Sequence, residues 1–404
     1  MPTSTRDRPA LQQRELPVLI TVDVCDGAYD PGDRKARFKH VMDALPAIRD
    51  VLNEIINAGR GGLMPVTWFV RSDSQVGEAT GDAAGLVRGW SAFWQEVRDL
   101  SGEIGWHPHL YKRDEQGWSP IRDPKRLSDE AGRIWREITA AGWKPLSCRM
   151  GESVCSSELM VFLDSIGLRC DSTALPGRVR DDGVRWFDWQ RTPILPYHPA
   201  KGDYRRPPES LGASDRIEGE EPLSILEIPF TVAGIRAPYD PRDPSTRPPR
   251  RYIDLAYDPE RLRRGFAPQI RGSKYLVLVI HPLQTAGKYV PQGGLVIGGI
   301  DVLRANLRMV MDGIEQADRI PRLVTMSGFR NLWMGEDIGA LETEDLAVDQ
   351  VKGAKKRGSR ERKKDGVRAS SADAAKGARR GRGAKPKLTA ASRSRKAAPR
   401  KRPG

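Results

Sequence analysis

The chain has 404 residues, 38% of them hydrophobic and 30% charged, and its formal net charge is +14 at pH 7. This length suits one large α/β domain or two smaller ones, and no apolar run approaches the roughly 20 residues of a membrane-spanning helix. The charge is uneven, because residues 351–404 hold 21 Lys or Arg and three Asp or Glu, a balance of +18 that leaves −4 for residues 1–350. The basic character therefore belongs to the tail.

The cysteines and the N-terminus bear on the compartment. Cys25, Cys148, Cys155 and Cys170 form no Cys-x-x-Cys pair, which argues against a cysteine-based zinc site or a disulfide framework. Residues 1–17 are polar and lack the apolar core of a secretory signal. We expect a soluble, cytoplasmic protein.

Short apolar runs alternate with amphipathic segments along most of the chain. Helices are expected where apolar residues recur with a helical period, and Ser128 would cap the third of them. The predicted helices span residues 33–57, 85–100, 128–141, 156–166, 259–269 and 301–316. The predicted core strands span residues 18–23, 65–70, 103–106, 146–149, 168–171, 275–280 and 322–326.

Residues 176–249 interrupt this alternation, because they are rich in Pro, Arg and Asp and show strand patterns only at 185–189 and 224–232. Repeated strand–helix units with one long excursion predict a single α/β domain, a distorted or incomplete (β/α) barrel of about seven parallel strands. No glycine fingerprint follows the first strand, which disfavours a dinucleotide-binding sheet.

Three regions follow from this pattern: a flexible N-terminus at 1–16, the barrel domain at 17–335, and a linker and tail at 336–404. The tail consists mainly of Lys, Arg, Ala, Gly and Ser, with almost no large apolar side chain. Such a segment cannot bury enough surface to offset its chain entropy, so we expect it to be disordered.

Two of only five histidines, His107 and His109, follow the third strand and lie two residues apart. In extended chain such side chains point to the same side, so both imidazoles could reach one metal ion. The alternative is a loop with two solvated or hydrogen-bonded histidines. Polar residues at the ends of separate strands are typical of a barrel active site.

Asp23 and Asp26 end the first apolar strand. Carboxylates there could complete a divalent metal site with the histidines, although one of them could instead cap a helix or stabilise a turn. If the strand stays regular, Asp23 and Cys25 share a face and Asp26 points away, whereas a turn near Cys25 would bring both carboxylates to the site. A Cys25 thiolate ligand is a further alternative.

His281 ends the most hydrophobic strand, where a general acid or base with a pKa near neutrality would fit. A hydrogen-bonded core histidine is the alternative. Arg149, at the end of its own strand, could orient an active-site aspartate or form only a surface salt bridge. His40 lies within a predicted amphipathic helix and His198 in a proline-rich loop, so neither is expected to act chemically.

These segments, in this order, resemble the polysaccharide deacetylase family, also called the NodB-homology or carbohydrate esterase-type deacetylase fold. The resemblance spans roughly residues 16–332. Residues 21–27, Thr-Val-Asp-Val-Cys-Asp-Gly, are similar to the first motif, Thr-Phe-Asp-Asp-Gly, with two residues inserted between the aspartates. His107-Pro-His109 resembles the second motif, usually His-x-x-x-His.

The third motif resembles a stretch that begins at Cys148-Arg149 and ends at Asp171-Ser172. Asp188-Trp189 is similar to the fourth motif, and residues 276–282, which contain His281, resemble the fifth.

The resemblance implies roles for these residues. Asp26, His107 and His109 would bind a divalent metal, zinc or else cobalt or nickel, and Asp23 and Asp26 could exchange roles. Asp23 would be the general base, Arg149 would tether it and His281 would be the general acid. We expect the substrate to be bound by Trp189, Asp188 and Tyr111.

The function expected on this basis is metal-dependent hydrolysis of acetyl groups from an N- or O-acetylated sugar polymer or oligosaccharide intermediate. A first alternative is hydrolysis of another non-peptide C–N bond, such as a small amide or ring amide, on the same fold. A second is a non-catalytic protein whose tail, residues 351–404, binds nucleic acid, an anionic envelope polymer or acidic lipid without sequence specificity.

Overall fold

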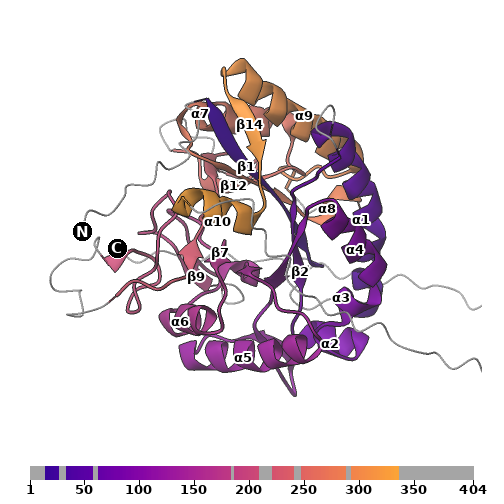
Figure 1. Ribbon diagram of the computed structural model, residues 1–404, viewed down its shortest axis with the longest axis vertical. Helices are drawn as coiled ribbons and strands as arrows, with labels where there is room; N and C mark the ends of the chain where they lie inside the picture. The colour runs from indigo at the N-terminus through magenta and orange to yellow at the C-terminus, as the bar shows by residue number, and fades with distance from the viewer. Residues whose placement is uncertain are drawn as a thin grey trace, which may run out of the picture. The chain divides into compact units, whose positions relative to one another are not determined.

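A curved, mostly parallel β-sheet lies at the centre of the computed structural model, which describes residues 14–26, 33–57, 62–182, 186–208, 221–240, 247–287 and 293–335 (Figure 1). Within these ranges the sheet has ten strands in the order β10-β7-β6-β3-β2-β1-β13-β12-β11, and β14 also pairs with β1. Among the described strands, the two ends of this order do not pair with each other, so the predicted incomplete barrel is confirmed. The strands are β1 (Glu15–Val24), β2 (Thr67–Arg71), β3 (Glu103–His107), β6 (Ser147–Cys148), β7 (Cys170–Asp171), β10 (Leu226–Glu227), β11 (Val232–Gly234), β12 (Arg250–Asp254), β13 (Leu276–Ile280) and β14 (Ile320–Leu323).

Strand β1 is the centre of the sheet. It pairs in parallel with β13, where Val18 lies opposite Leu276, and with β2, where Thr21 lies opposite Thr67. Its apolar side chains are buried on both faces of the sheet. A parallel strand covered on both faces reads as a continuous apolar run, which is the pattern seen in residues 18–22.

Helices surround the outside of the sheet, as Figure 1 shows for α1, α5 and α9. The predicted helical periods are confirmed in α1, α6, α7 and α9, and the Asp33 side chain caps α1 by accepting a hydrogen bond from the Ala36 backbone at 3.0 Å. The helices are α1 (Arg34–Ile56), α2 (Ser74–Thr80), α3 (Gly85–Gly89), α4 (Ser91–Asp99), α5 (Pro124–Ala140), α6 (Ser157–Ser165), α7 (Pro259–Gly272), α8 (Pro282–Thr285), α9 (Ile300–Gln316) and α10 (Met326–Met334).

Two predicted helices differ in their bounds. The segment 85–100 forms two helices, α3 and α4, because the backbone at Trp90 leaves the helical region at φ −124° and ψ 33°. Helix α5 begins at Pro124, so the prediction of Ser128 as its cap is wrong. Asp123 caps it by accepting a hydrogen bond from the Arg126 backbone at 2.8 Å.

The predicted final strand, residues 322–326, corresponds to β14, which starts and ends earlier, and it is followed by a helix that was not predicted. Strand β14 ends at Leu323, and the Thr325 hydroxyl then caps α10 by accepting a hydrogen bond from the Gly328 backbone. Helix α10 covers the amino-terminal ends of β2 and β3, because the Met326 backbone donates to Thr67 and the Ser327 side chain and backbone donate to Glu103. The active-site candidates lie at the other ends of these strands.

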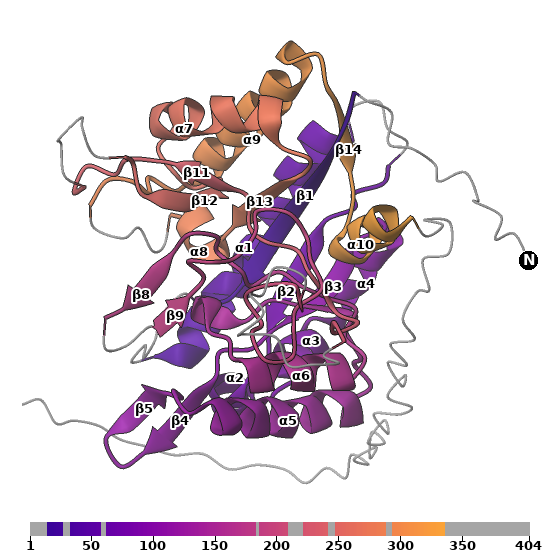
Figure 2. The same ribbon diagram turned by 90° about the vertical axis from the view of Figure 1, so that its left-hand side faces the viewer.

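Two small hairpins lie outside the main sheet, on the side of the molecule toward which β1 runs (Figure 2). They are β4 (Tyr111–Asp114) with β5 (Gly117–Pro120), and β8 (Val179–Asp181) with β9 (Trp186–Asp188). The predicted strand at 224–232 is divided into β10 and β11, and the sequence analysis missed β12 altogether. β12 pairs in parallel with β13 and antiparallel with β11, so it extends the sheet beside the fifth motif.

No helix in the described ranges is both long and apolar enough to span a bilayer. The predicted flexible N-terminus falls outside these ranges up to residue 13, and so does the whole predicted tail, residues 336–404. The predictions for those segments therefore remain sequence-based.

Candidate active site

The carboxyl ends of four strands bring polar side chains to one cavity of about 430 Å³. Asp23 lies at the end of β1, His107 at the end of β3, and Arg149 and His281 directly after β6 and β13. Because parallel strands place their carboxyl ends along the same edge, residues far apart in the sequence meet there. The cavity also receives Cys25, His109 and residues from β8, β9 and β12.

Asp23 is buried and paired with Arg149. An Arg149 Nη1 donates to Asp23 Oδ1 at 2.6 Å and to the Thr21 hydroxyl at 2.8 Å, while its Nε donates to the Ser172 carbonyl at 2.9 Å. The guanidinium carbon lies 4.4 Å from the centroids of two phenyl rings, those of Phe69 and Phe230. Hydrogen bonds and the two phenyl rings therefore hold the Arg149 guanidinium in place, where it binds one carboxylate oxygen of Asp23.

The second carboxylate oxygen of Asp23 is turned toward His281. Asp23 Oδ2 lies 3.8 Å from His281 Nε2. Burial by itself would raise the pKa of Asp23, but the charge of Arg149, followed by those of His107 and His281, holds this pKa below its ordinary value. Asp23 is therefore an ionised acceptor near neutral pH.

His281 is held by a carboxylate that the sequence analysis did not identify. His281 Nδ1 lies 2.9 Å from Asp254 Oδ2, at the end of β12. Burial would lower the pKa of His281, but Asp254 and then Asp23 raise it above its ordinary value. The pair keeps His281 protonated toward higher pH and aims Nε2 into the cavity, where a general acid would be needed.

His107 and His109 come together with Cys25. One ring nitrogen of each histidine and the Cys25 Sγ lie within 4.8 Å of one another. All three residues are buried. His107 Nδ1 lies 2.7 Å from the Arg149 carbonyl, so His107 Nε2 is the free ring nitrogen, 3.2 Å from His109 Nε2. The group offers two imidazole nitrogens and one sulfur to an ion.

The electrostatics of this group fit a metal site. Burial lowers the pKa of His107 to about 4 and that of His109 well below its ordinary value, so both rings are neutral near pH 7 and can donate lone pairs. His109 Nδ1 is buried and has no hydrogen-bond partner among the described residues. Nitrogen and sulfur donors are those that Zn²⁺ prefers.

Gly151 supports the position of His109. A Cβ atom at this position would lie 2.2 Å from His109 Cδ2, so only glycine fits against the ring. The backbone amide of His109 donates to Asp73 Oδ2 at 3.0 Å, which fixes the chain on the other side. Both contacts hold the imidazole toward His107.

Asp26 does not join this group. β1 stays regular through Val24, so Asp23 and Cys25 face the cavity, and Asp26 points the other way. Its carboxylate is fully buried and paired with Arg71, which also donates to Asp73 at 2.6 Å. A buried guanidinium requires such anions, so the geometry does not support Asp26 as a metal ligand and places Cys25 beside the histidines instead.

The three residues expected to bind substrate lie elsewhere. The Trp189 ring is fully buried and its Nε1 donates to the Ser153 carbonyl at 2.9 Å, so it presents no face to a ligand. The Asp188 carboxylate pairs with Arg205 at 2.8 Å. Tyr111 is buried with its ring centroid 5.8 Å from that of His109, and within the described ranges none of the three lines the cavity.

Aromatic rings from other segments line the cavity. Tyr252, on β12, has its ring centroid 6.1 Å from that of His281 and 5.3 Å from that of Phe230. Strand β12 has no strong sequence signal, because its residues Arg-Arg-Tyr-Ile-Asp contain no continuous apolar run. Because this strand was not recognised, Asp254 at its end was not identified either.

The two remaining histidines lie away from the cavity, as expected. His40 is exposed on α1, and His198 Nδ1 lies 3.1 Å from the Ile225 carbonyl.

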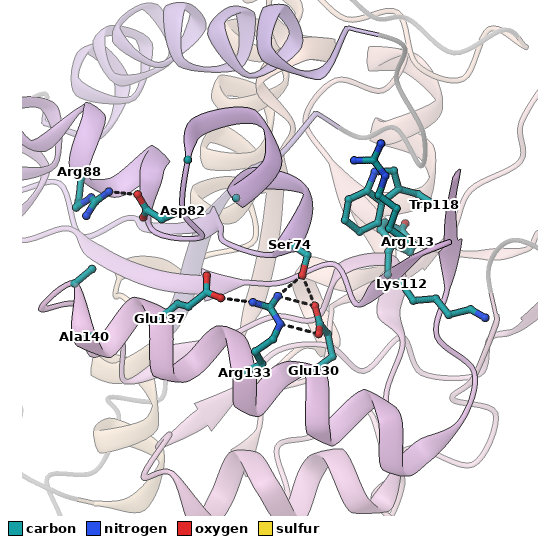
Figure 3. A pocket seen from close by; sticks show the side chains of 14 residues that line it. Ser74, Asp82, Arg88, Lys112, Arg113, Trp118, Glu130, Arg133, Glu137 and Ala140 are labelled. Carbon is teal, nitrogen blue, oxygen red and sulfur yellow. Dashed lines mark hydrogen bonds and ion pairs between the residues drawn. The ribbon is translucent and has the colours of Figure 1, made fainter. Parts of the chain in front are cut away.

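A second, larger pocket of about 860 Å³ lies at α2, α5 and the β4–β5 hairpin (Figure 3). Its charged side chains are largely paired with one another, as Figure 3 shows for Arg133 with Glu130 and Glu137 and for Arg88 with Asp82. None of the histidines or carboxylates at the strand ends lines it. The smaller cavity is therefore the candidate active site.

Comparison with known proteins supports the fold. No family model and no curated protein sequence matches the chain. Among solved structures, it is similar to a candidate glycoside hydrolase/deacetylase from Parabacteroides distasonis, with 13% identity, a TM-score of 0.52, and coverage of 79% of this chain and 72% of that chain. A candidate polysaccharide deacetylase from Mycobacterium smegmatis matches with 17% identity, a TM-score of 0.44, and coverage of 79% and 90%.

At such identities the likeness concerns the fold. The fold expected from the resemblance to the polysaccharide deacetylase family is thus confirmed, and what the chain does must be argued from its own cavity.

Proposed function

We propose that the chain is a metal-dependent hydrolase that removes acetyl groups from an N- or O-acetylated sugar. The observation that carries the proposal is the continuous series Arg149–Asp23–His281–Asp254, which lies in the same cavity as the Cys25, His107 and His109 group. A carboxylate base and an imidazolium acid with oppositely shifted pKa values, beside a metal-capable group, suit hydrolysis of an acyl bond.

A divalent metal held by His107, His109 and Cys25 would supply Lewis-acid polarisation of the acyl carbonyl and would lower the pKa of a nearby water molecule. Asp23 accepts a proton from the attacking water through Oδ2, while Arg149 keeps Oδ1 in place. His281 donates the proton on Nε2 to the departing sugar nitrogen or oxygen as the acyl bond breaks. The products are acetate and the deacetylated sugar.

The metal is tested by elemental mass spectrometry of the purified full-length chain. We expect about one zinc or other divalent ion per chain, lost in His107→Ala and retained in the control His40→Ala, whose histidine is exposed on α1. Cys25→Ser should lower metal occupancy, and Asp26→Asn should not. No bound metal after reconstitution with zinc, cobalt or nickel would overturn the proposal.

The reaction is tested by measuring acetate release from N- and O-acetylated sugars. Asp23→Asn should reduce kcat/KM by about 10²-fold or more, because the proton acceptor is lost while the side-chain shape is kept. Equal rates for the variant and the wild type would remove Asp23 from the mechanism.

A further inference from the structure

One arginine in the cavity has no acidic partner among the residues that the structure describes. Arg178, directly before β8, is half-buried and lines the cavity together with His281. Its guanidinium donates to the Arg250 carbonyl at 2.5 Å. Across the described part of the chain, no carboxylate lies within 4.0 Å of it. A partly desolvated cation without a counter-ion is costly, so its position calls for an anion.

The neighbouring arginines differ from Arg178 in this respect. Arg180 pairs with Asp182 at 2.6 Å, and Arg251 makes a two-pronged contact with Asp240, with both distances 2.9 Å. All three arginines line the cavity. Burial lowers the pKa of Arg178, and the charges of Arg251 and then Arg180 lower it further, which shows that Arg178 lies in a positive local field.

The position of Arg178 relates it to the reacting groups. Its bond to the Arg250 carbonyl ties the β8–β9 hairpin to the start of β12. The same strand carries Tyr252, which packs near His281, and ends at Asp254, which holds His281. Arg178 therefore lies on the side of the cavity formed by β8 and β12, and Cys25, His107 and His109 come from β1 and β3.

We propose that the acetylated sugar carries an anionic group, a carboxylate or a phosphate, that Arg178 binds through its guanidinium. Planar guanidinium donors match the oxygens of both groups. Arg180 and Arg251, already paired, contribute attraction rather than the principal contact. This inference rests on the proposed deacetylase function and adds the class of sugar.

The cavity suits a small acidic sugar. Its volume of about 430 Å³ lies within the usual range for small-molecule sites, and Phe187, Phe230 and Tyr252 offer ring surface to the apolar faces of a sugar. A single acetylated hexosamine with its acyl group toward His107 and its charged substituent toward Arg178 would use both sides of the cavity.

The test is isothermal titration calorimetry of the full-length chain with three probes: N-acetylglucosamine, N-acetylglucosamine 6-phosphate and 2-acetamido-2-deoxyglucuronic acid. The wild type should bind at least one anionic sugar 10-fold or more tightly than the neutral sugar. Arg178→Gln should reduce this ratio about 10-fold, and Arg178→Lys should retain part of it. The control Arg88→Gln, in the pocket of Figure 3, should leave the ratio unchanged.

The two anionic probes separate phosphate from carboxylate as the bound group. A wild type without preference for either, or a preference that survives in Arg178→Gln, overturns the inference. Acetate release measured on the same samples distinguishes the two proposals. A preference for anionic sugars without hydrolysis would support the anion site and contradict the deacetylase function. Hydrolysis without a preference for anionic sugars would support the deacetylase function and contradict the anion site.

Discussion

Asp254 and His281 form a pair in which one residue sets the protonation of the other. Because Asp254 raises the pKa of His281, the imidazolium persists toward higher pH, and activity that needs this acid should fall as pH rises through the raised pKa. The Asp254 Oδ1 atom also accepts a hydrogen bond from the Ala256 backbone at 2.8 Å, which an asparagine oxygen can replace.

We predict that Asp254→Asn lowers the pKa of His281 and moves the alkaline limb of the kcat/KM profile to lower pH. At pH 8 the rate should fall by about 10-fold or more, since less of the acid is protonated. The pH profile of acetate release measures this change, and nuclear magnetic resonance titration of His281 measures it without activity. Asp312→Asn, exposed on α9, is the control, and an unmoved His281 titration would contradict the assignment.

Two buried carboxyl groups outside the cavity also interact. Asp171 and Glu227 lie opposite each other in the β7–β10 pairing, and both are buried. Burial and then the charge of Asp171 raise the pKa of Glu227 well above its ordinary value. Asp171 Oδ1 accepts from Thr173 at 2.7 Å, and Glu227 Oε1 accepts from the Ala174 backbone at 2.9 Å. The protonated form of Glu227 is therefore the one that the fold favours.

The stability of the fold should follow this protonation. With a raised folded-state pKa, the stabilisation is complete below the unfolded value near 4.3 and is lost as pH rises through the folded value. Glu227→Gln, always neutral, should exceed the wild type in unfolding free energy by about 1 kcal/mol or more at high pH, measured by urea unfolding. Glu315→Gln, exposed on α9, should show no such gain. A wild type whose unfolding free energy does not fall as pH rises would contradict the proposed interaction between Asp171 and Glu227.

At the scale of elements, the start of α5 depends on one side chain. Asp123 accepts the Arg126 amide at 2.8 Å and Pro124 follows at the first helical position, whereas Ser128 lies inside the helix and donates to the Pro124 carbonyl at 3.2 Å. We predict that Asp123→Ala lowers the unfolding free energy by about 1 kcal/mol. Ser128→Ala should change the unfolding free energy by less than about 0.5 kcal/mol. A larger loss in Ser128→Ala than in Asp123→Ala, measured by urea unfolding, would identify Ser128 as the cap.

Strand β12 shows why some elements escape sequence analysis. Its residues are polar at one end and buried at the other, with Ile253 and Asp254 packed against β13. Its strand conformation is fixed by pairing with β13 on one side and β11 on the other, not by its own periodicity. Such a strand becomes recognisable only once its neighbours are placed.

At the scale of the whole molecule, the net charge differs between the basic tail and the mildly acidic residues 1–350. The 21 basic residues of 351–404 should bind a polyanion by counterion release. We predict that the full-length chain binds double-stranded DNA with an affinity that falls about 10-fold or more between 50 and 200 mM salt. A chain ending at residue 350 should lose this binding and keep its rate of acetate release, as gel-shift and acetate assays would show. Binding that survives the truncation would place the polyanion site elsewhere.

The sequence by itself determined the α/β class, most of the strands and helices, and the strand ends at which Asp23, His107, Arg149 and His281 occur. These features depend on local hydrophobic period and on residues that directly follow apolar runs, so they can be read from one chain. The same local reading could not choose between Cys25 and Asp26, because that choice depends on where β1 stops being regular and on the buried Arg71 that binds Asp26.

Only the tertiary structure decided the partners. Asp254 reaches His281 because β12 lies beside β13, and Trp189 is withdrawn from the cavity because its ring packs against Tyr204. The start of the β8–β9 hairpin places Arg178 against the Arg250 carbonyl and near Arg251, and no acidic partner for it occurs among the described residues. Such contacts join residues 15 to 72 positions apart. Their energies depend on burial and distance, which the order of residues along the chain does not contain.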